Sequence, residues 1–235
     1  MNALILAAGL GTRIQPLTNS MPKCLVEING KSMLEFWIDK LQLSQINEIL
    51  INTHHFSELV QERVKTIASS KVLRLVHEQH LLGTAGTLRK VIQLCHSEED
   101  LLVLHCDNYS SIDLGQLIQR HLNRDSRFTA TMGIFKTNDI QNSGMVKVTS
   151  EGDILEFIEK PSHSKLEWAN AAVYVLSQEF QRTIADQFLN STSITEDIIP
   201  FTLSKIQAYK IEGFHIDMGT HAALERINRS RELIN

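Results

Sequence analysis

Short apolar runs alternate with amphipathic stretches along the first half of the chain. The run from Leu4 to Leu6 is followed by residues 33–43, where apolar side chains recur at helical spacing. The same alternation continues with strand-like runs at 48–52, 72–76 and 101–104, and with helix-like stretches at 59–67, 85–94 and from Asp113 onward. Four strand-to-helix alternations predict an α/β fold with a doubly wound, mainly parallel, Rossmann-like sheet.

The pattern changes after residue 128, where strand-like pieces follow one another directly. They cover residues 128–135, 144–149, 154–158 and 171–176, with a turn at 151–153. This order predicts an antiparallel addition to the sheet. A helix at 178–188, strands near 208–217 and a last helix at 220–233 complete the prediction. No linker or repeat interrupts the chain, so we expect a single domain over residues 1–235.

Composition and charge exclude some classes of protein. Apolar residues make up 43% of the chain and charged residues 21%, an ordinary globular composition. The formal net charge of -4 gives no strong positive field, so we expect no nucleic-acid partner. No apolar segment approaches the roughly 18 residues that a spanning helix needs, so we expect a soluble protein with no membrane partner. Three cysteines cannot all pair with one another, which favours the reducing cytoplasm.

Candidate chemistry begins where the first predicted strand meets its loop. Gly9 and Gly11 let backbone amides approach a ligand, and Arg13 adds a donor suited to phosphate oxygens. Two better-known phosphate motifs are excluded. Ile14 occupies the third-glycine place of a dinucleotide fingerprint, and Leu25 stands where a Walker A loop before Gly30 requires glycine.

Longer sequence blocks carry a resemblance to a known family. Residues 6–13 read L-A-A-G-L-G-T-R, followed by P-L-T at 16–18 and P-K at 22–23. The segment resembles the signature of the sugar-1-phosphate nucleotidylyltransferases. Further blocks that resemble this family follow in order at 78–88, Asp107, 157–161, 170–175 and 214–220. The G-T-A-G sequence at 83–86 is most similar to mannose-1-phosphate and heptose-1-phosphate guanylyltransferases, with muramic-acid-type uridylyltransferases as a near alternative.

The resemblance implies the nucleotide-diphospho-sugar transferase fold and a reaction. Residues from 1 to about 125 would form the nucleotide-binding half, and residues from about 126 to 235 the sugar-phosphate-binding half. A nucleoside monophosphate would pass from an NTP, with GTP favoured, to a sugar 1-phosphate, and pyrophosphate would leave. The left-handed β-helix domain of longer relatives is not expected. The alternatives are a uridylyltransferase acting on a sugar 1-phosphate such as N-acetylmuramate 1-phosphate, or a non-catalytic nucleotide-sugar-binding paralogue.

The resemblance also assigns the catalytic residues. Asp107 follows a predicted strand, where ligands of open α/β sheets bind, and would pair with Asp217 to hold Mg²⁺. Taken alone, an aspartate after a strand is more often a turn residue or a helix cap. Arg13 and Lys23 would bind the triphosphate, and Lys160 the phosphate of the sugar.

Further binding residues come from the same blocks. The residues expected to bind the nucleotide are Leu6, Ala8, Gly9, Gly11, Thr12, Arg13, Lys23, Glu78, Gly83, Thr84, Ala85 and Gly86. Those expected to bind the sugar phosphate are Asn108, Gly144, Glu159, Lys160 and Asn170. For Glu159 a surface ion pair, and for Asn170 a turn, are the alternatives.

A preference for guanine is predicted from Glu78. A carboxylate only accepts hydrogen bonds, and guanine presents two adjacent donors, N1–H and N2–H, to such a group. The alternative is a Glu78 side chain that points to solvent at the end of its strand.

Two further features set expectations about cysteines and metals. Cys106 stands where the family usually has glycine, and we expect its side chain to pack as a small buried apolar group. The histidines form no H-E-x-x-H and the cysteines no C-x-x-C, so we expect no tightly held transition metal. The sequence leaves the oligomeric state open between monomer and homodimer.

Overall fold

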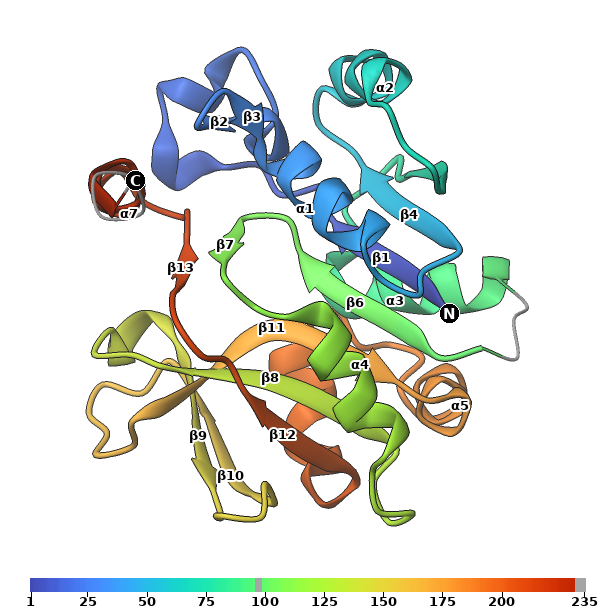
Figure 1. The fold of residues 1–235 in the computed structure, drawn as a ribbon, viewed down its shortest axis with the longest axis vertical. Helices are drawn as coiled ribbons and strands as arrows, with labels where there is room; N and C mark the ends of the chain where they lie inside the picture. The colour runs from blue at the N-terminus through green and yellow to red at the C-terminus, as the bar shows by residue number, and fades with distance from the viewer. Residues whose placement is uncertain (96–98, 231–235) are drawn as a thin grey trace.

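The computed structural model describes residues 1–95 and 99–230, and its first half is a parallel sheet with connecting helices (Figure 1). The parallel strands, in spatial order, are β6 (Leu101–His105), β1 (Asn2–Leu6), β4 (Glu48–Thr53) and β5 (Val72–His77). The helices between and after them are α1 (Met33–Gln42), α2 (Ser57–Thr66), α3 (Gly83–Cys95) and α4 (Leu114–Leu122). The predicted strand-to-helix alternation is therefore confirmed.

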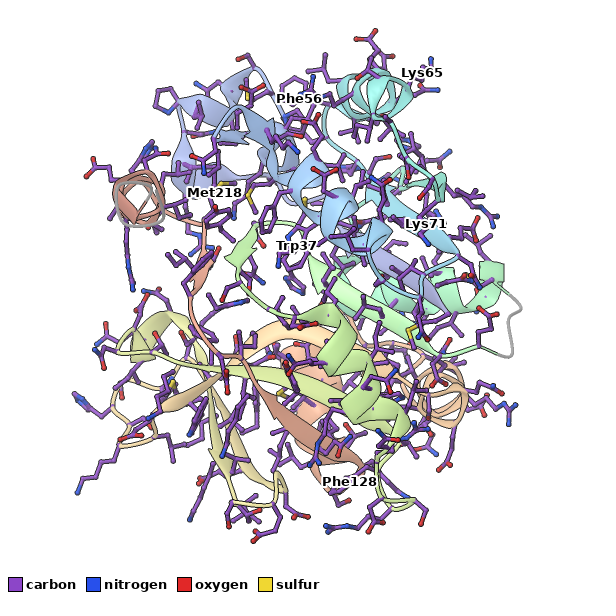
Figure 2. The ribbon with its side chains drawn as sticks, in the orientation of Figure 1. Trp37, Phe56, Lys65, Lys71, Phe128 and Met218 are labelled. Atoms are coloured by element: carbon purple, nitrogen blue, oxygen red, sulfur yellow. The ribbon has the colours of Figure 1, made fainter. Side chains whose placement is uncertain are left out.

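Apolar side chains alternate between the two faces of this sheet. Ile5 of β1 packs in a core with Trp37 of α1, which is labelled in Figure 2 and fully buried. Leu4 packs on the opposite face with Val91 of α3. Both faces are thus covered, as a parallel sheet with apolar strands requires. The sheet is doubly wound, as predicted.

The second half adds antiparallel strands to the same sheet. They are β8 (Ala130–Lys136), β9 (Gly144–Val148), β10 (Ile154–Glu159) and β11 (Trp168–Leu176), followed by β12 (Ile206–Lys210), which is parallel to β8. Among the described residues the complete sheet has nine strands in the order β10-β9-β11-β6-β1-β4-β5, with β8 pairing β11 and β12. β11 pairs with β6 in an antiparallel register, and this pairing joins the two halves of the fold.

Helical segments complete the second half. They are α5 (Gln178–Gln187), a π-helical turn (Ile194–Ile198), α6 (Ile199–Thr202) and α7 (His221–Ser230). The predicted last helix is confirmed over the part that α7 covers, and positions 231–233 lie outside the described residues. No helix within residues 1–95 and 99–230 is long and apolar enough to cross a membrane.

Side-chain caps explain where two helices begin. Ser32 accepts a hydrogen bond from the Glu35 amide, and Glu35 in return accepts one from the Ser32 amide, which is a complete capping box before α1. Asp113 accepts a bond from the Gln116 amide and so caps α4. The Gln116 side chain bonds the Asp113 carboxylate instead of its backbone.

Two short ladders lie outside the large sheet, and their pairing was not predicted, although residues 215–217 fall within the strands predicted near 208–217. The first is the hairpin of β2 (Glu27–Ile28) and β3 (Lys31–Ser32). The second pairs β7 (Asn108–Ser110) with β13 (His215–Asp217), two segments that Figure 1 shows side by side. Both ladders are too short for an alternating pattern to stand out in the sequence. The second one assembles the candidate site.

Candidate active site

The loop after β1 folds back on itself at a glycine. Gly11 has a φ of +66°, and an added Cβ there would lie 2.7 Å from a Thr18 side-chain carbon. The Thr18 hydroxyl also donates to the Gly11 carbonyl oxygen at 2.7 Å. Only glycine fits this left-handed position at such close range. The returning chain then enters a 3₁₀ turn, Lys23–Leu25, which directs the Lys23 side chain inward.

Lys23 meets the two predicted carboxylates. Its side chain is 9% exposed, and its ammonium donates to Asp107 and lies 3.7 Å from an Asp217 oxygen. Arg13 lies 3.7 Å from the other Asp217 oxygen. Four predicted residues from distant parts of the sequence therefore form one cluster.

The β7–β13 ladder is what brings the two aspartates together. Asp107 immediately precedes β7, and Asp217 ends β13, opposite Asn108. The Met218 amide donates to the Asp107 carbonyl oxygen at 2.8 Å, and Met218, labelled in Figure 2, is fully buried. His215 fixes the other end of the ladder, with its Nδ1 3.0 Å from the Ser110 hydroxyl oxygen. Burial lowers the pKa of His215 to about 4, so the ring is neutral at neutral pH.

The two carboxyl groups differ in acidity. Burial raises the pKa of Asp107, but the Lys23 ammonium outweighs burial and holds that pKa below its usual value. Burial and then the Asp107 carboxylate raise the pKa of Asp217, although Lys23 and Arg13 oppose the rise. Asp107 is therefore the stronger acid of the two, and Asp217, whose side chain is 48% exposed, keeps its proton to a higher pH.

This pair fits a hard divalent cation. Carboxylate oxygens are the ligands that Mg²⁺ prefers, and proteins often supply one or two of them while substrate phosphates and water supply the others. The described residues hold no group of three or more His, Cys, Asp or Glu that could bind a metal ion. A cation held by Asp107 and Asp217 would therefore need oxygen ligands from substrate or solvent.

A cavity of about 180 Å³ opens beside the cluster, and we call it the N-terminal cavity. Its lining includes seven of the residues predicted to bind nucleotide, namely Leu6, Ala8, Gly9, Lys23, Glu78, Gly83 and Thr84. Asp107 also lines it. Of the other predicted nucleotide residues, Gly11 and Thr12 belong to the loop and 3₁₀ turn after β1, and Ala85 and Gly86 lie within α3. Arg13 lines a different cavity, which also contains Asp217.

Glu78 does not present a free carboxylate to a base. Its side chain is 2% exposed, and one oxygen accepts bonds from Asn52 Nδ2 at 2.9 Å and from the Thr87 hydroxyl at 2.5 Å. The other oxygen accepts from the Leu82 amide at 3.2 Å. Because the protein's own donors already engage both oxygens, this bonding gives no support to a Glu78 contact with guanine, which stays a prediction. The alternative of a Glu78 side chain that points to solvent is wrong, since the residue is buried.

Asn52 and Thr87 are site residues that the sequence reading missed. Both line the N-terminal cavity, and Asn52 Oδ1 also accepts a 2.6 Å bond from the Ala7 amide. The network therefore ties the loop after β1 to β4 and α3. A polar residue at the carboxyl end of the strand-like run 48–52 was the available signal.

The first turn of α3 is held by the second half of the chain. Gly83 has a φ of +73°, and an added Cβ would lie 2.3 Å from the Thr192 carbonyl oxygen. That oxygen accepts a bond from the Ala85 amide, and the Thr84 hydroxyl accepts one from the Ile194 amide. The wall of the N-terminal cavity thus depends on contacts with residues near 190.

The residues predicted to bind sugar phosphate gather around β9, β10 and β11. Gly144 pairs with Glu159 across the β9–β10 ladder, and an added Cβ on Gly144 would lie 2.7 Å from Glu159 Oε2. This oxygen is buried and has no hydrogen-bond partner among the described residues. Asn170 donates to the Tyr174 hydroxyl at 2.7 Å, while Asn108 donates to the Ala171 carbonyl oxygen at 3.1 Å.

Lys160 stands apart from the central cluster. Its side chain is 60% exposed, and its ammonium lies 3.4 Å from Glu159 Oε1. Its backbone is left-handed, with a φ of +43°, and its amide donates to the Ser143 carbonyl oxygen at 3.1 Å. The structure therefore brings Lys160 to Glu159, with no direct contact to the two aspartates.

Cys106 packs as a small buried side chain, as the sequence predicts. It is 2% exposed and lies in the wall of the N-terminal cavity with Cys24. Burial, followed by the contact with the Cys24 thiol, raises the pKa of the Cys106 thiol well above its usual value. A thiol in this state is not an activated nucleophile.

Comparisons with curated proteins identify relatives of this chain. The chain is 32% identical over 225 residues to the mannose-1-phosphate guanylyltransferase catalytic subunit beta of Dictyostelium discoideum, covering 93% of this chain and 61% of that protein. It is 31% identical to the same subunit of Drosophila melanogaster, covering 92% of this chain and 59% of that protein. The chain thus spans about three fifths of the length of these curated relatives.

The fold is also similar to that of a solved structure. The crystal structure of HddC from Yersinia pseudotuberculosis matches with a TM-score of 0.81 at 20% identity, covering 98% of this chain and 99% of that one. HddC complexed with GMP-PN matches with a TM-score of 0.79. The sequence model described as Nucleotidyl transferase matches residues 2–232. The chain therefore belongs to the nucleotidyl transferase family.

Proposed function

We propose that this chain transfers a nucleoside monophosphate from an NTP, with GTP favoured, to a sugar 1-phosphate. The observation that carries the proposal is the cluster of Lys23, Asp107 and Asp217 beside a cavity that the nucleotide signature lines. Membership of the nucleotidyl transferase family supports the reaction class. The products are an NDP-sugar and pyrophosphate.

The reaction joins two anions, so charge neutralisation is its main requirement. An oxygen of the sugar phosphate attacks the α-phosphorus, the bond between that phosphorus and the bridging oxygen to the β-phosphorus breaks, and the electron pair leaves with pyrophosphate. Lys23 and Arg13 bind the triphosphate, with Lys23 at the α-phosphate. Mg²⁺ held by Asp107 and Asp217 would offset charge on the transferring group. Little covalent chemistry is left for the protein, which acts by positioning.

The two halves of the single domain divide the substrates. Residues up to about 125 hold the nucleotide in the N-terminal cavity. Residues from about 126 hold the sugar phosphate, where Lys160 binds the phosphate. The buried, unpartnered Glu159 Oε2 accepts a bond from a sugar hydroxyl beside Gly144, which supplies the partner that the free protein lacks. Asn108 and Asn170 shape the neighbouring wall.

The preference for GTP rests on the relatives. The curated relatives are mannose-1-phosphate guanylyltransferases, and HddC was solved with GMP-PN. Since Glu78 is occupied within the protein, the base edge is left to the main chain and side chains around Gly83 and Thr84, which line the cavity. We also propose a cytoplasmic enzyme, a monomer or a homodimer, in keeping with three free cysteines.

A matrix of substrates tests the proposal. The protein with Mg²⁺ is incubated with each of GTP, UTP, dTTP, ATP and CTP against mannose 1-phosphate, glucose 1-phosphate and N-acetylmuramate 1-phosphate, and pyrophosphate is measured. We expect the kcat/KM for GTP to exceed the kcat/KM for UTP by at least about 10-fold. A preference for UTP would contradict the proposed preference for guanine but leave the nucleotidyl transfer reaction standing. Binding of NTP without pyrophosphate release from any pair would indicate a non-catalytic nucleotide-sugar-binding paralogue.

A further inference from the structure

A second cavity lies beside α7 and connects the carboxylate pair with the sugar side. This α7 cavity has a volume of about 250 Å³, and its lining includes Arg13 and Asp217 of the central cluster together with Asn142 and Ser143. Ser143 adjoins Gly144 and accepts the backbone bond from Lys160. The cavity therefore spans the space between the central cluster and the residues assigned to the sugar phosphate.

Helix α7 presents one face to this space. Ala222, Ala223 and Arg226 line the cavity, and positions three and four apart lie on one side of an α-helix. Ile227, the next residue, is 1% exposed and packs into the core, which fixes the rotation of the helix. Two small side chains leave room in front of the guanidinium.

Arg226 also lines a larger adjoining cavity of about 870 Å³. The residues common to the two cavities are Phe135, Thr137, Asp139, His215 and Arg226. All of them belong to the second half of the chain, and none lines the N-terminal cavity. Arg226 thus faces the space on the sugar side of the site.

The cations of the site differ in how they are already paired. Lys23 donates to Asp107, Arg13 lies 3.7 Å from Asp217, and the Lys160 ammonium lies 3.4 Å from Glu159. Among the side chains that the structure describes, none forms a hydrogen bond or ion pair with the Arg226 guanidinium. An arginine on a cavity wall with its donors uncommitted suits a phosphate, which it can bind through two parallel bonds.

We infer that Arg226 binds the phosphate of the sugar 1-phosphate, together with Lys160, and holds it facing the α-phosphate of the NTP. The inference rests on the proposed function for the identity of the substrate. It adds a phosphate-binding residue from α7, outside the sequence blocks that carry the family resemblance. The sugar phosphate then lies between two cations that approach it from different elements, β10 with its following residue and α7.

Kinetics of Arg226→Ala, with Arg226→Lys beside it, test this role. With GTP and the best sugar 1-phosphate of the substrate matrix, Arg226→Ala should raise the KM for the sugar 1-phosphate about 10- to 100-fold, the usual effect of losing charge-assisted bonds. The KM for GTP should change less than about 3-fold. Arg226→Lys keeps the charge but loses the paired donors of the guanidinium. Its KM for the sugar 1-phosphate should therefore lie between those of wild type and Arg226→Ala.

Two variants serve as matched controls. Asn228→Ala changes an exposed residue on the same helix, and Arg182→Ala removes the same charge from the exposed surface of α5. Both should keep the wild-type KM for the sugar 1-phosphate. An unchanged KM in Arg226→Ala would overturn the inference, as would a rise in the KM for GTP alone, which would move Arg226 to the triphosphate.

A binding measurement separates this inference from the proposed function. Calorimetry with mannose 1-phosphate, and with mannose as the phosphate-free comparison, needs no turnover. If wild type releases no pyrophosphate from any pair, the proposed function fails, while weaker binding of mannose 1-phosphate by Arg226→Ala still supports the inference. Equal binding by wild type and Arg226→Ala, or none by wild type, overturns it.

Discussion

The two sides of the site, which we propose for the nucleotide and for the sugar, differ in how far their polar groups are already satisfied. In the wall of the N-terminal cavity, Glu78, Asn52 and Thr87 bond one another and the backbone. On the sugar side, Glu159 Oε2 is buried without a partner among the described residues, and Lys160 and Arg226 are exposed. The Glu78 network is complete in the free protein, although His105 Nε2 in the same cavity wall has no hydrogen-bond partner among the described residues. On the sugar side, substrate would complete the bonding of Glu159.

This difference has an energetic consequence. A buried polar group without a partner costs free energy that a ligand can recover by bonding it, whereas a satisfied network stabilises the free protein. Substitutions on the nucleotide side should therefore lower stability and weaken substrate binding together. Those on the sugar side should weaken binding and leave stability nearly unchanged.

The largest effect is expected at the centre, where the two sides meet. Asp107→Ala removes one of two carboxylates that would hold Mg²⁺, so kcat should fall on the order of 100-fold or more. The side chain is 30% exposed, so the fold should persist. Pyrophosphate release at saturating Mg²⁺ measures the rate, and circular dichroism checks the fold. Asp217→Ala should behave alike, and a near-normal rate in either variant would remove the metal-binding role.

A pair of glycine substitutions tests the rigidity of the nucleotide side. Gly83→Ala places a Cβ 2.3 Å from a backbone oxygen at a φ of +73°, and should lower the free energy of unfolding by about 2 to 4 kcal/mol. Gly9→Ala meets no atom within 4 Å and should leave it unchanged within about 0.5 kcal/mol. Urea denaturation measures both. An equal decrease in the free energy of unfolding in both variants would show that contact with residues near 190 does not hold the first turn of α3.

Two glutamate-to-glutamine changes compare the sides directly. In Glu78→Gln a single acceptor oxygen faces three donors, so the free energy of unfolding should fall by about 1 to 3 kcal/mol and the KM for NTP should rise. Glu159→Gln should change stability by less than about 0.5 kcal/mol and raise the KM for the sugar 1-phosphate. Urea denaturation and steady-state kinetics report the two quantities.

The base enters the same experiment. Because the Glu78 carboxylate is bonded within the protein, Glu78→Gln should raise the KM for GTP and the KM for UTP by the same factor. A loss confined to GTP would instead restore the reading in which Glu78 contacts guanine.

The smallest effect concerns pH and the two aspartates. The pKa of Asp107 is lowered in the folded protein, so its charge stabilises the fold above about pH 4, the unfolded value, and this stabilisation is lost as pH falls through the folded pKa. The pKa of Asp217 is raised, so its charge opposes folding above the folded pKa, and protonation relieves this as pH falls. The two groups therefore have opposite signs.

Neutral substitutions should show those signs at pH 7. Asp107→Asn should lower the free energy of unfolding by about 1 to 3 kcal/mol, because it weakens the pairing of a buried ammonium. Asp217→Asn should raise it by less than about 1 kcal/mol, since that side chain is 48% exposed. The Asp107 difference should shrink as the pH of the denaturation falls below about 4, whereas the Asp217 difference should already shrink above pH 4, as pH falls through the raised pKa of Asp217. Equal signs at pH 7 would contradict the assignment.

The fold was predictable where a regular pattern runs over several residues. Continuous apolar runs identify β1, β4 and β6, and helical spacing identifies their helices, because both faces of the sheet need apolar cover. The β7–β13 ladder has three residues in each strand, too few for a period to show. Its partners are also far apart in the chain, so only the tertiary fold reveals them.

The site was predictable in its charged centre and less so in its surroundings. Lys23, Asp107 and Asp217 belong to sequence blocks and do converge. The bonding of Glu78 could not be read from its block, because its partners come from β4 and α3. Arg226 carries no motif at all, and only the position of α7 beside a cavity draws attention to it.

The β7–β13 ladder also determines the order in which the parts of the site form as the chain is synthesised and folds. Ribosomes make a chain from its N-terminus, so residues 6–107, which line the N-terminal cavity, are synthesised well before residues 215–218. A nascent chain that reaches only to β12 contains every side chain of that cavity and one carboxylate of the pair. Pairing such distant segments is slow relative to local folding. The second carboxylate therefore arrives in a late folding step, on a scaffold that is already in place.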